Sequence, residues 1–147
     1  MRDGETIRRS SEIVKSYADE GVRVVVVVSA ISGVTDGILE ALDDAEKGGK
    51  ERVERFIEDL RLKHLEACKD AVRDPKLRGE ISRKLCEEVD ELRKLLSVVA
   101  YLKEVTPRVR DYALSFGERL STRIFWGALI DQGLKAEYLR GLSLIHI

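Results

Sequence analysis

Cysteine, proline and aromatic residues are scarce in this chain of 147 residues. Its two cysteines, Cys68 and Cys86, are too few for a disulfide framework, and both fall in segments with helical spacing, so we expect reduced thiols in a cytoplasmic protein. The formal net charge is only −1, which gives no overall bias toward nucleic acid or an anionic membrane. No apolar run is long enough to span a bilayer. From the charge balance and the short apolar runs together, we expect neither nucleic acid nor a membrane as a partner.

The longest β-branched run lies at residues 22–28, with five consecutive valines from Val24 to Val28. Such a run suits a strand that is covered on both faces. Small polar residues and glycines follow, and a helical pattern starts near Thr35. Strand, short turn and helix form the first half of a βαβ unit, and ligands bind at the carboxyl ends of parallel strands. We therefore expect a site at residues 29–35.

The rest of the chain is mostly of helical character. A first helix, capped by Asp3 and stopped by Gly21, has an inner face of Ile7, Val14, Tyr17 and Ala18. Helical spacing over residues 51–101, interrupted at Asp74-Pro75, predicts an αα-hairpin whose second helix begins near Gly79 and whose core includes His64 rather than a metal ligand. Thr106-Pro107 starts a further helix, with threonine as its cap. Ser115 and Glu118 have capping-box spacing, which predicts the start of another helix. Residues 135–139 alternate as a short strand.

Two segments carry a family resemblance. Ser-Ala-Ile-Ser-Gly-Val-Thr-Asp at residues 29–36 (the first signature segment) follows the valine run, and Leu-Ser-Phe-Gly-Glu-Arg-Leu-Ser at residues 114–121 (the second signature segment) follows Thr-Pro-Arg-Val-Arg-Asp at residues 106–111. In this order, and with a helical insertion between them, they resemble aspartokinases of the amino-acid kinase family. The resemblance covers residues 3–141. It implies an α/β fold, namely a partial three-layer αβα architecture with a parallel-rich sheet and an inserted helical hairpin.

The resemblance also implies a reaction. Aspartokinases transfer the γ-phosphoryl group of ATP to the β-carboxylate of L-aspartate, which gives 4-phospho-L-aspartate and begins the synthesis of lysine, threonine and methionine. ATP as co-substrate, Mg²⁺ and a homo-oligomeric parent enzyme are expected with it. Phosphoryl transfer depends mainly on positioning and charge neutralisation.

Three residues match the family's aspartate pocket. Ser29 and Thr35 would line the pocket, and Glu118 would hold the α-ammonium group of the substrate. Ser32, Gly33 and Gly117 would form the supporting loop, and no catalytic or metal-binding residue is expected. From the residues alone, the hydroxyls can equally be strand-end and helix-cap groups, and Glu118 can be a capping-box glutamate. Arg119 and Arg123 could pair with phosphate or with a substrate carboxylate, but a solvated helix face is the commoner place for such residues and is the assignment made here.

The family's motif Lys-Phe-Gly-Gly-Thr-Ser, which carries a lysine and the first glycine loop, is absent. We therefore expect an N-terminal fragment that is inactive alone, with residues 1–141 as a partial kinase domain on the aspartate-binding side. Residues 142–147 depart from the Gly-rich continuation of the family and form an atypical tail whose native origin is in question. An unpaired strand edge would give this fragment a tendency to aggregate.

Other interpretations stay open at this stage. The parent enzyme can be another amino-acid-kinase-like phosphotransferase that acts on a carboxylate, a carbamate or a nucleoside monophosphate, or it can be fused to homoserine dehydrogenase. From a different class, the hairpin at 51–101 can belong to a non-catalytic interaction module. A dinucleotide-binding domain is disfavoured because no Gly-x-Gly-x-x-Gly follows the valine run.

Overall fold

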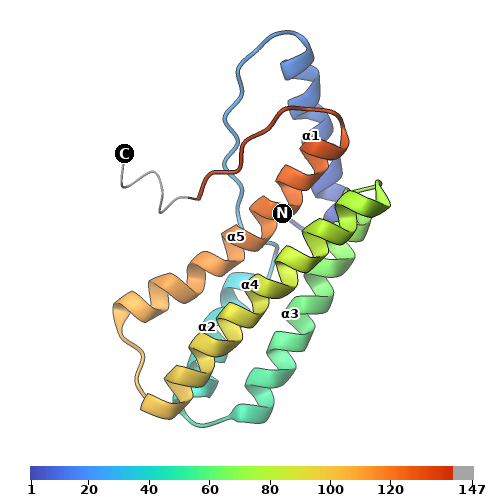
Figure 1. Ribbon diagram of the computed structural model, residues 1–147. Coiled ribbons are helices and arrows are strands. Elements are labelled where there is room, and N and C mark those ends of the chain that lie inside the picture. Colours follow the sequence, from blue (N-terminus) through green and yellow to red (C-terminus); the bar gives the residue numbers. More distant parts are fainter. Residues whose placement is uncertain (141–147) are drawn as a thin grey trace.

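The computed structural model describes residues 1–140, so that the predicted tail at 142–147 lies outside the described residues. Within this part of the chain the regular structure is helical (Figure 1), and its five helices are α1 (Gly4–Asp19), α2 (Val34–Glu46), α3 (Lys50–Ala71), α4 (Pro75–Leu102) and α5 (Pro107–Asp131). None of these helices is both long enough and apolar enough to cross a membrane.

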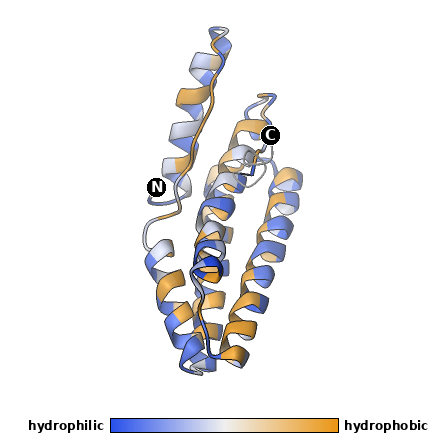
Figure 2. Cartoon of the chain, turned by 90° about the vertical axis from the view of Figure 1, so that its left-hand side faces the viewer, coloured by the Kyte–Doolittle hydropathy of each residue, from blue (hydrophilic) through white to orange (hydrophobic). Residues whose placement is uncertain are grey.

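The predicted α/β fold with a parallel-rich sheet is wrong for residues 1–140, which contain no strand. The valine run and residues 134–140 are extended, but no hydrogen bond between two backbone groups joins residues 23–30 to another described segment. A strand needs a neighbour because its N–H and C=O groups have no partners within the segment itself. The valines are not covered on both faces either, since Val25 and Val27 are 92% and 93% exposed. Figure 2 shows this hydrophobic stretch beside α1.

The predicted boundaries of α1 are confirmed. The side chain of Asp3 accepts a hydrogen bond from the backbone N–H of Thr6 at 2.8 Å, and Gly21 has a φ of 84°, which favours glycine. Ile7 is fully buried as expected, whereas Tyr17 is 53% exposed, so its assignment to the inner face is wrong.

The predicted αα-hairpin is confirmed as α3 and α4, which lie side by side in Figure 1. The second helix begins at Pro75 rather than near Gly79, because Asp74 accepts a hydrogen bond from the N–H of Leu77 at 2.7 Å and acts as the N-cap. Cys68 is buried in the core and Cys86 is half-buried, and both thiols are free.

Helix α5 is continuous, and the prediction of a separate helix starting at Ser115 is wrong. It begins after Thr106, whose hydroxyl accepts a hydrogen bond from the N–H of Val109 at 3.2 Å. Ser115 lies inside the helix and donates its hydroxyl to the carbonyl of Tyr112 at 2.6 Å. A serine can satisfy its hydroxyl on the preceding turn without ending a helix, which is why the capping-box spacing misled the prediction.

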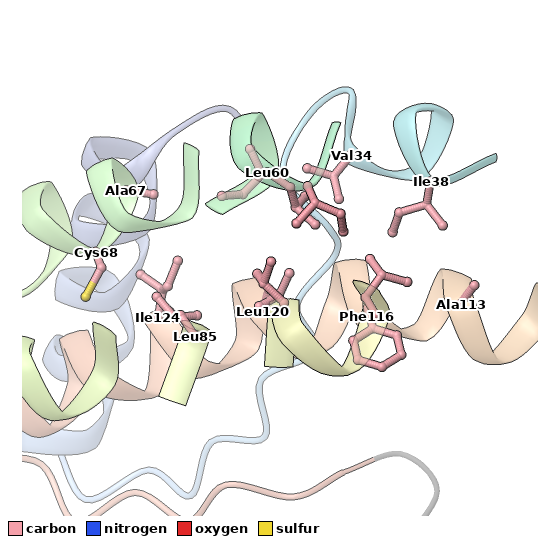
Figure 3. Close-up of a cluster of buried hydrophobic side chains, with 14 of the residues drawn as sticks. Val34, Ile38, Leu60, Ala67, Cys68, Leu85, Ala113, Phe116, Leu120 and Ile124 are labelled. Atoms are coloured by element: carbon pink, nitrogen blue, oxygen red, sulfur yellow. The ribbon is translucent and has the colours of Figure 1, made fainter. Parts of the chain in front are cut away.

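The core lies between α5 and the other helices. Figure 3 shows one row of α5 side chains facing residues of α2, α3 and α4. The row on α5 consists of Ala113, Phe116, Leu120 and Ile124, all fully buried, and the facing residues include Val34, Ile38, Leu60 and Leu85. Because residues three and four apart share one helix face, this row gives α5 a continuous apolar stripe.

At its far end, α5 is fixed by Asp131. The carboxylate of Asp131 accepts hydrogen bonds from the backbone N–H groups of Arg73 and Asp74, at 3.0 and 2.9 Å, in the turn between α3 and α4. It also pairs with Arg8 of α1. This one side chain therefore joins three parts of the helical body.

Candidate functional site

The two signature segments meet in space although Ser29 and Ser121 are 92 positions apart. The hydroxyl of Ser121 donates to the carbonyl of Ser29 at 2.7 Å. At Gly117 a Cβ atom would lie 2.9 Å from the Cβ of Ala30, so the absence of a side chain allows α5 to approach residues 29–34 this closely. Gly117 is a helical residue, and its assignment to a supporting loop is wrong.

Val34 of the first signature segment contacts Gly117 of the second, and Thr35 and Glu118 are the next residues along the chain. The Cγ1 atom of Val34 lies 3.5 Å from the Cβ position of Gly117. Both Thr35 and Glu118 are exposed beside this contact. The two predicted site residues are therefore each one position along the chain from a contact between the signature segments.

The start of α2 is not capped by a hydroxyl group of the preceding loop. The N-cap of α2 is Gly33, with a φ of 84°, and no side chain caps the helix. Within residues 1–140 the hydroxyls of Ser32 and Thr35 make no hydrogen bond, and the hydroxyl of Ser29 lies 3.5 Å from the α-ammonium of Met1. The interpretation of Ser32 and Thr35 as helix caps is therefore wrong.

Glu118 lies in the middle of α5, so it cannot act as a capping-box residue. No ion pair or side-chain hydrogen bond of its carboxylate is found among the described residues. Successive residues of a helix turn by about 100°, which places Glu118 between the face of Gly117 and Ser121 and the face of Arg119. An unpaired carboxylate in this position can accept hydrogen bonds from a bound ammonium group.

Lys63 is the residue at this loop that sequence reasoning missed. Its ammonium group, which comes from α3, donates to the carbonyl of Ser32 at 2.6 Å and lies 3.7 Å from the Cβ position of Gly33. An ammonium group has three donors, so two remain for other acceptors. No local signal distinguishes Lys63 from the many other charged residues of the hairpin, because only the tertiary fold brings it to the loop.

Arg119 and Arg123 are not on a solvated face, so that assignment is wrong. Their side chains are only 10% and 12% exposed, and both lie near the carboxylate of Glu88 on α4. Burial acts against the charged form of Arg119, but the carboxylates of Glu91 and Glu88 raise its pKa above the ordinary value. Both guanidinium groups are thus held by the helical hairpin and are directed away from solvent.

His64 is a core residue, as predicted. It is fully buried, and its Nδ1 donates to the carbonyl of Leu60 at 2.7 Å. Burial lowers the pKa of this imidazole. Over the described range 1–140, no three His, Cys, Asp or Glu side chains gather in a way that could hold a metal ion.

A cavity of about 450 Å³ lies elsewhere. It lies between the valine run and residues 134–139, and α1 and α5 bound it. Its lining is mainly apolar and includes Val24, Phe125, Trp126 and Leu139, and none of the predicted site residues belongs to it. The predicted site residues Thr35 and Glu118 are instead exposed beside the contact between the two signature segments.

Comparison with known proteins agrees with the motifs. The sequence profile described as "Amino acid kinase family" matches residues 1–146. The aspartokinase of Schizosaccharomyces pombe is 29% identical over 139 residues, which cover 90% of this chain and 27% of that protein. Aspartokinase 1, chloroplastic, and aspartokinase 3, chloroplastic, of Arabidopsis thaliana are 33% and 34% identical, and the match covers 92% of this chain and 23% of each relative. The chain thus spans about a quarter of the length of the curated relatives it matches. A profile match over almost every residue shows that the chain belongs to the amino acid kinase family.

Proposed function

We propose that this chain supplies the aspartate-binding side of an aspartate kinase, which transfers the γ-phosphoryl group of ATP to the β-carboxylate of L-aspartate. The observation that carries the proposal is the contact between the two signature segments, in which Ser121 binds the Ser29 carbonyl and Gly117 packs on Ala30. The relatives named aspartokinase support the choice of substrate.

The residues at this contact suit an amino acid with two carboxylates. Hydroxyls such as those of Ser29 and Thr35 can donate to a carboxylate, and Glu118 can accept from the α-ammonium. The hydroxyls carry no charge, so Lys63 would supply positive charge opposite a substrate carboxylate. The task of these residues is to orient the β-carboxylate, since phosphoryl transfer depends on alignment.

ATP and Mg²⁺ would supply the phosphoryl group and neutralise its charge. Residues 1–140 offer no cluster of metal ligands, so we assign no step of the reaction to the metal ion. A cytoplasmic location and a homo-oligomeric parent remain predictions, as does the division into a partial kinase domain at 1–141 and a separate tail. The Arabidopsis relatives carry the word chloroplastic in their names.

A binding experiment on the purified chain tests the proposal. Calorimetric titration with L-aspartate should give saturable binding that is weakened about tenfold or more, about 1.4 kcal/mol, by Glu118→Gln and by Thr35→Ala. Glu80→Gln, at an exposed glutamate of α4, is the matched control and should leave the affinity unchanged. Equal affinity of the wild type and both site variants would overturn the assignment of these residues.

A further inference from the structure

A buried carboxylate on the hairpin binds the arginines of α5. Glu88 of α4 is 3% exposed, and its Oε1 accepts hydrogen bonds from Nη2 and Nε of Arg123 at 2.6 and 3.1 Å. The same oxygen lies 4.0 Å from Arg119 and 3.8 Å from Arg140. Three guanidinium groups thus surround one carboxylate oxygen.

Aromatic rings complete this arrangement. The guanidinium of Arg119 lies 4.2 Å from the centre of the Phe116 ring, and that of Arg123 lies 4.8 Å from the centre of the Tyr138 ring. Guanidinium groups stack favourably on such rings, which restricts their orientation. The cluster therefore holds α5 against α4 in one rotational position.

Two buried polar atoms of the cluster have no hydrogen-bond partner within residues 1–140, namely Oε2 of Glu88 and Nε of Arg119. Such orphaned atoms are costly in a protein interior. A buried ion pair is also weak evidence for stability, because apolar residues of similar volume are often as good. Stability alone therefore gives a poor account of this cluster, and its position suggests another role.

The cluster and the candidate site occupy different faces of the same helix turns. Arg119 and Arg123 are four residues apart and face α4, whereas Gly117 and Ser121 are four residues apart and face residues 29–34. Glu118 projects between these two faces. Its direction is set by both contacts, so a rotation of α5 would change the direction of its carboxylate relative to residues 29–34.

We infer that Glu88 is a positioning residue, which fixes the rotation of α5 through Arg119 and Arg123 and thereby directs Glu118 to the substrate ammonium. This inference rests on the proposed function. The helical insertion that carries Glu88 would then contribute to aspartate recognition from a distance, without touching the substrate.

The test compares L-aspartate with succinate, which has both carboxylates but no ammonium and therefore does not need Glu118. Titrations use the purified chain and its Glu88→Gln variant. We expect aspartate affinity to fall about tenfold while succinate affinity changes less than about twofold, since misorientation affects only the group that is misplaced. Glu87→Gln removes a neighbouring charge that pairs with Arg83 and Lys84 on α4 itself, and should change neither affinity.

A double variant shows whether Glu88 acts through Glu118. If it does, Glu88→Gln combined with Glu118→Gln should bind aspartate no more weakly than Glu118→Gln alone. Additive losses, or equal losses for aspartate and succinate, would overturn the positioning role. If Glu118→Gln weakens aspartate binding but Glu88→Gln does not, the positioning role of Glu88 is overturned and the proposed function still stands.

Backbone amide NMR shifts of residues 116–123 provide a measurement that needs no ligand. In Glu88→Gln these shifts should move, whereas in Glu87→Gln they should not. Arg123→Lys keeps the charge but loses the paired hydrogen bonds to Glu88, and serves as the variant of choice if Glu88→Gln does not fold. Unchanged shifts in the folded variant would exclude the positioning role of Glu88, whether or not the wild type binds aspartate.

Discussion

The two sides of α5 differ in how completely the apolar side chains around them are buried. On one side Phe116, Leu120 and Ile124 are fully buried against α2, α3 and α4, as Figure 3 shows. On the other side the valine run and residues 134–140 border an open cavity, and Val25 and Val27 remain in solvent. A helix satisfies its own backbone hydrogen bonds, whereas an extended segment requires a neighbour. Apolar side chains are therefore buried more completely where α5 meets the other helices than along the valine run.

The largest effect is expected in the closed core. Phe116→Ala should lower the free energy of unfolding by about 3–5 kcal/mol, because it removes a fully buried ring and leaves a cavity. Val25→Ala, on the open side, should change it by less than about 0.5 kcal/mol. Urea unfolding of both variants measures the contrast. Similar losses for the two would show that the valine run is covered in solution.

A smaller loss is expected at the end of the core. Asp131→Asn should cost about 2 kcal/mol near neutral pH, since the carboxylate accepts from two backbone N–H groups and pairs with Arg8. Asp19→Asn, at an exposed carboxylate of α1, is the control. Chemical unfolding of both variants at pH 7 gives the comparison.

The same residue predicts a pH dependence. Burial tends to raise the pKa of Asp131, but the N–H groups of Arg73 and Asp74 and the charge of Arg8 outweigh it and hold the pKa below 3.8. A lowered pKa gives stability that is present above 3.8 and is lost as the pH falls through the folded-state value. The difference between the wild type and Asp131→Asn should therefore shrink in acid, and a constant difference would contradict the assignment.

His64 gives a further pH effect within the closed core. Burial holds its pKa below 6.5, so the unfolded chain binds a proton more readily than the folded one. Stability should be full above pH 6.5 and should fall as the pH decreases toward the folded-state pKa. His64→Leu should flatten this decrease, which unfolding at pH 7.5 and 5.5 would measure. An unchanged slope would assign the effect to other groups.

The smallest change in stability is expected on the open side, where the effect is on association. Val25→Lys and Val27→Lys should leave the unfolding free energy within about 0.5 kcal/mol and should reduce self-association, because a charge on an unpaired edge opposes strand pairing. Val28→Lys, at the neighbouring buried valine, should destabilise the fold instead. Sedimentation velocity measures association and urea unfolding measures stability. Equal association of the wild type, Val25→Lys and Val27→Lys would contradict the prediction.

The helices could be predicted from the sequence, because their signals are local. Asp3 and Thr106 cap the helices where their residue types and spacing indicate, whereas Asp74, expected only to interrupt the helical pattern, caps α4. The prediction of a sheet failed because a strand is not a local structure. Five valines favour an extended backbone, but only another strand at hydrogen-bonding distance makes it a strand, and residues 1–140 do not place one there.

The sequence also indicated candidate residues of the site, but not the contacts around them. Thr35 and Glu118 were found through the two signature segments, and their use as ligands of aspartate stays a prediction. Lys63 and Glu88 were missed because each reaches the site region from a helix whose charged residues look alike in sequence. The capping-box interpretation of Glu118 failed because one spacing fits both the start of a helix and its interior.

The sequence by itself determined the helical character of most of the chain, most of the apolar stripes and membership of the amino acid kinase family, since these depend on local hydrogen bonding, side-chain periodicity and motif order. The start of α4 and the continuity of α5 were decided only by the structure. Only the tertiary structure decided that Gly117 contacts Ala30, that Glu88 binds the arginines of α5 and that the valine run stays open. Contacts of this kind join residues that are far apart along the chain, and they form only when packing brings the helices together.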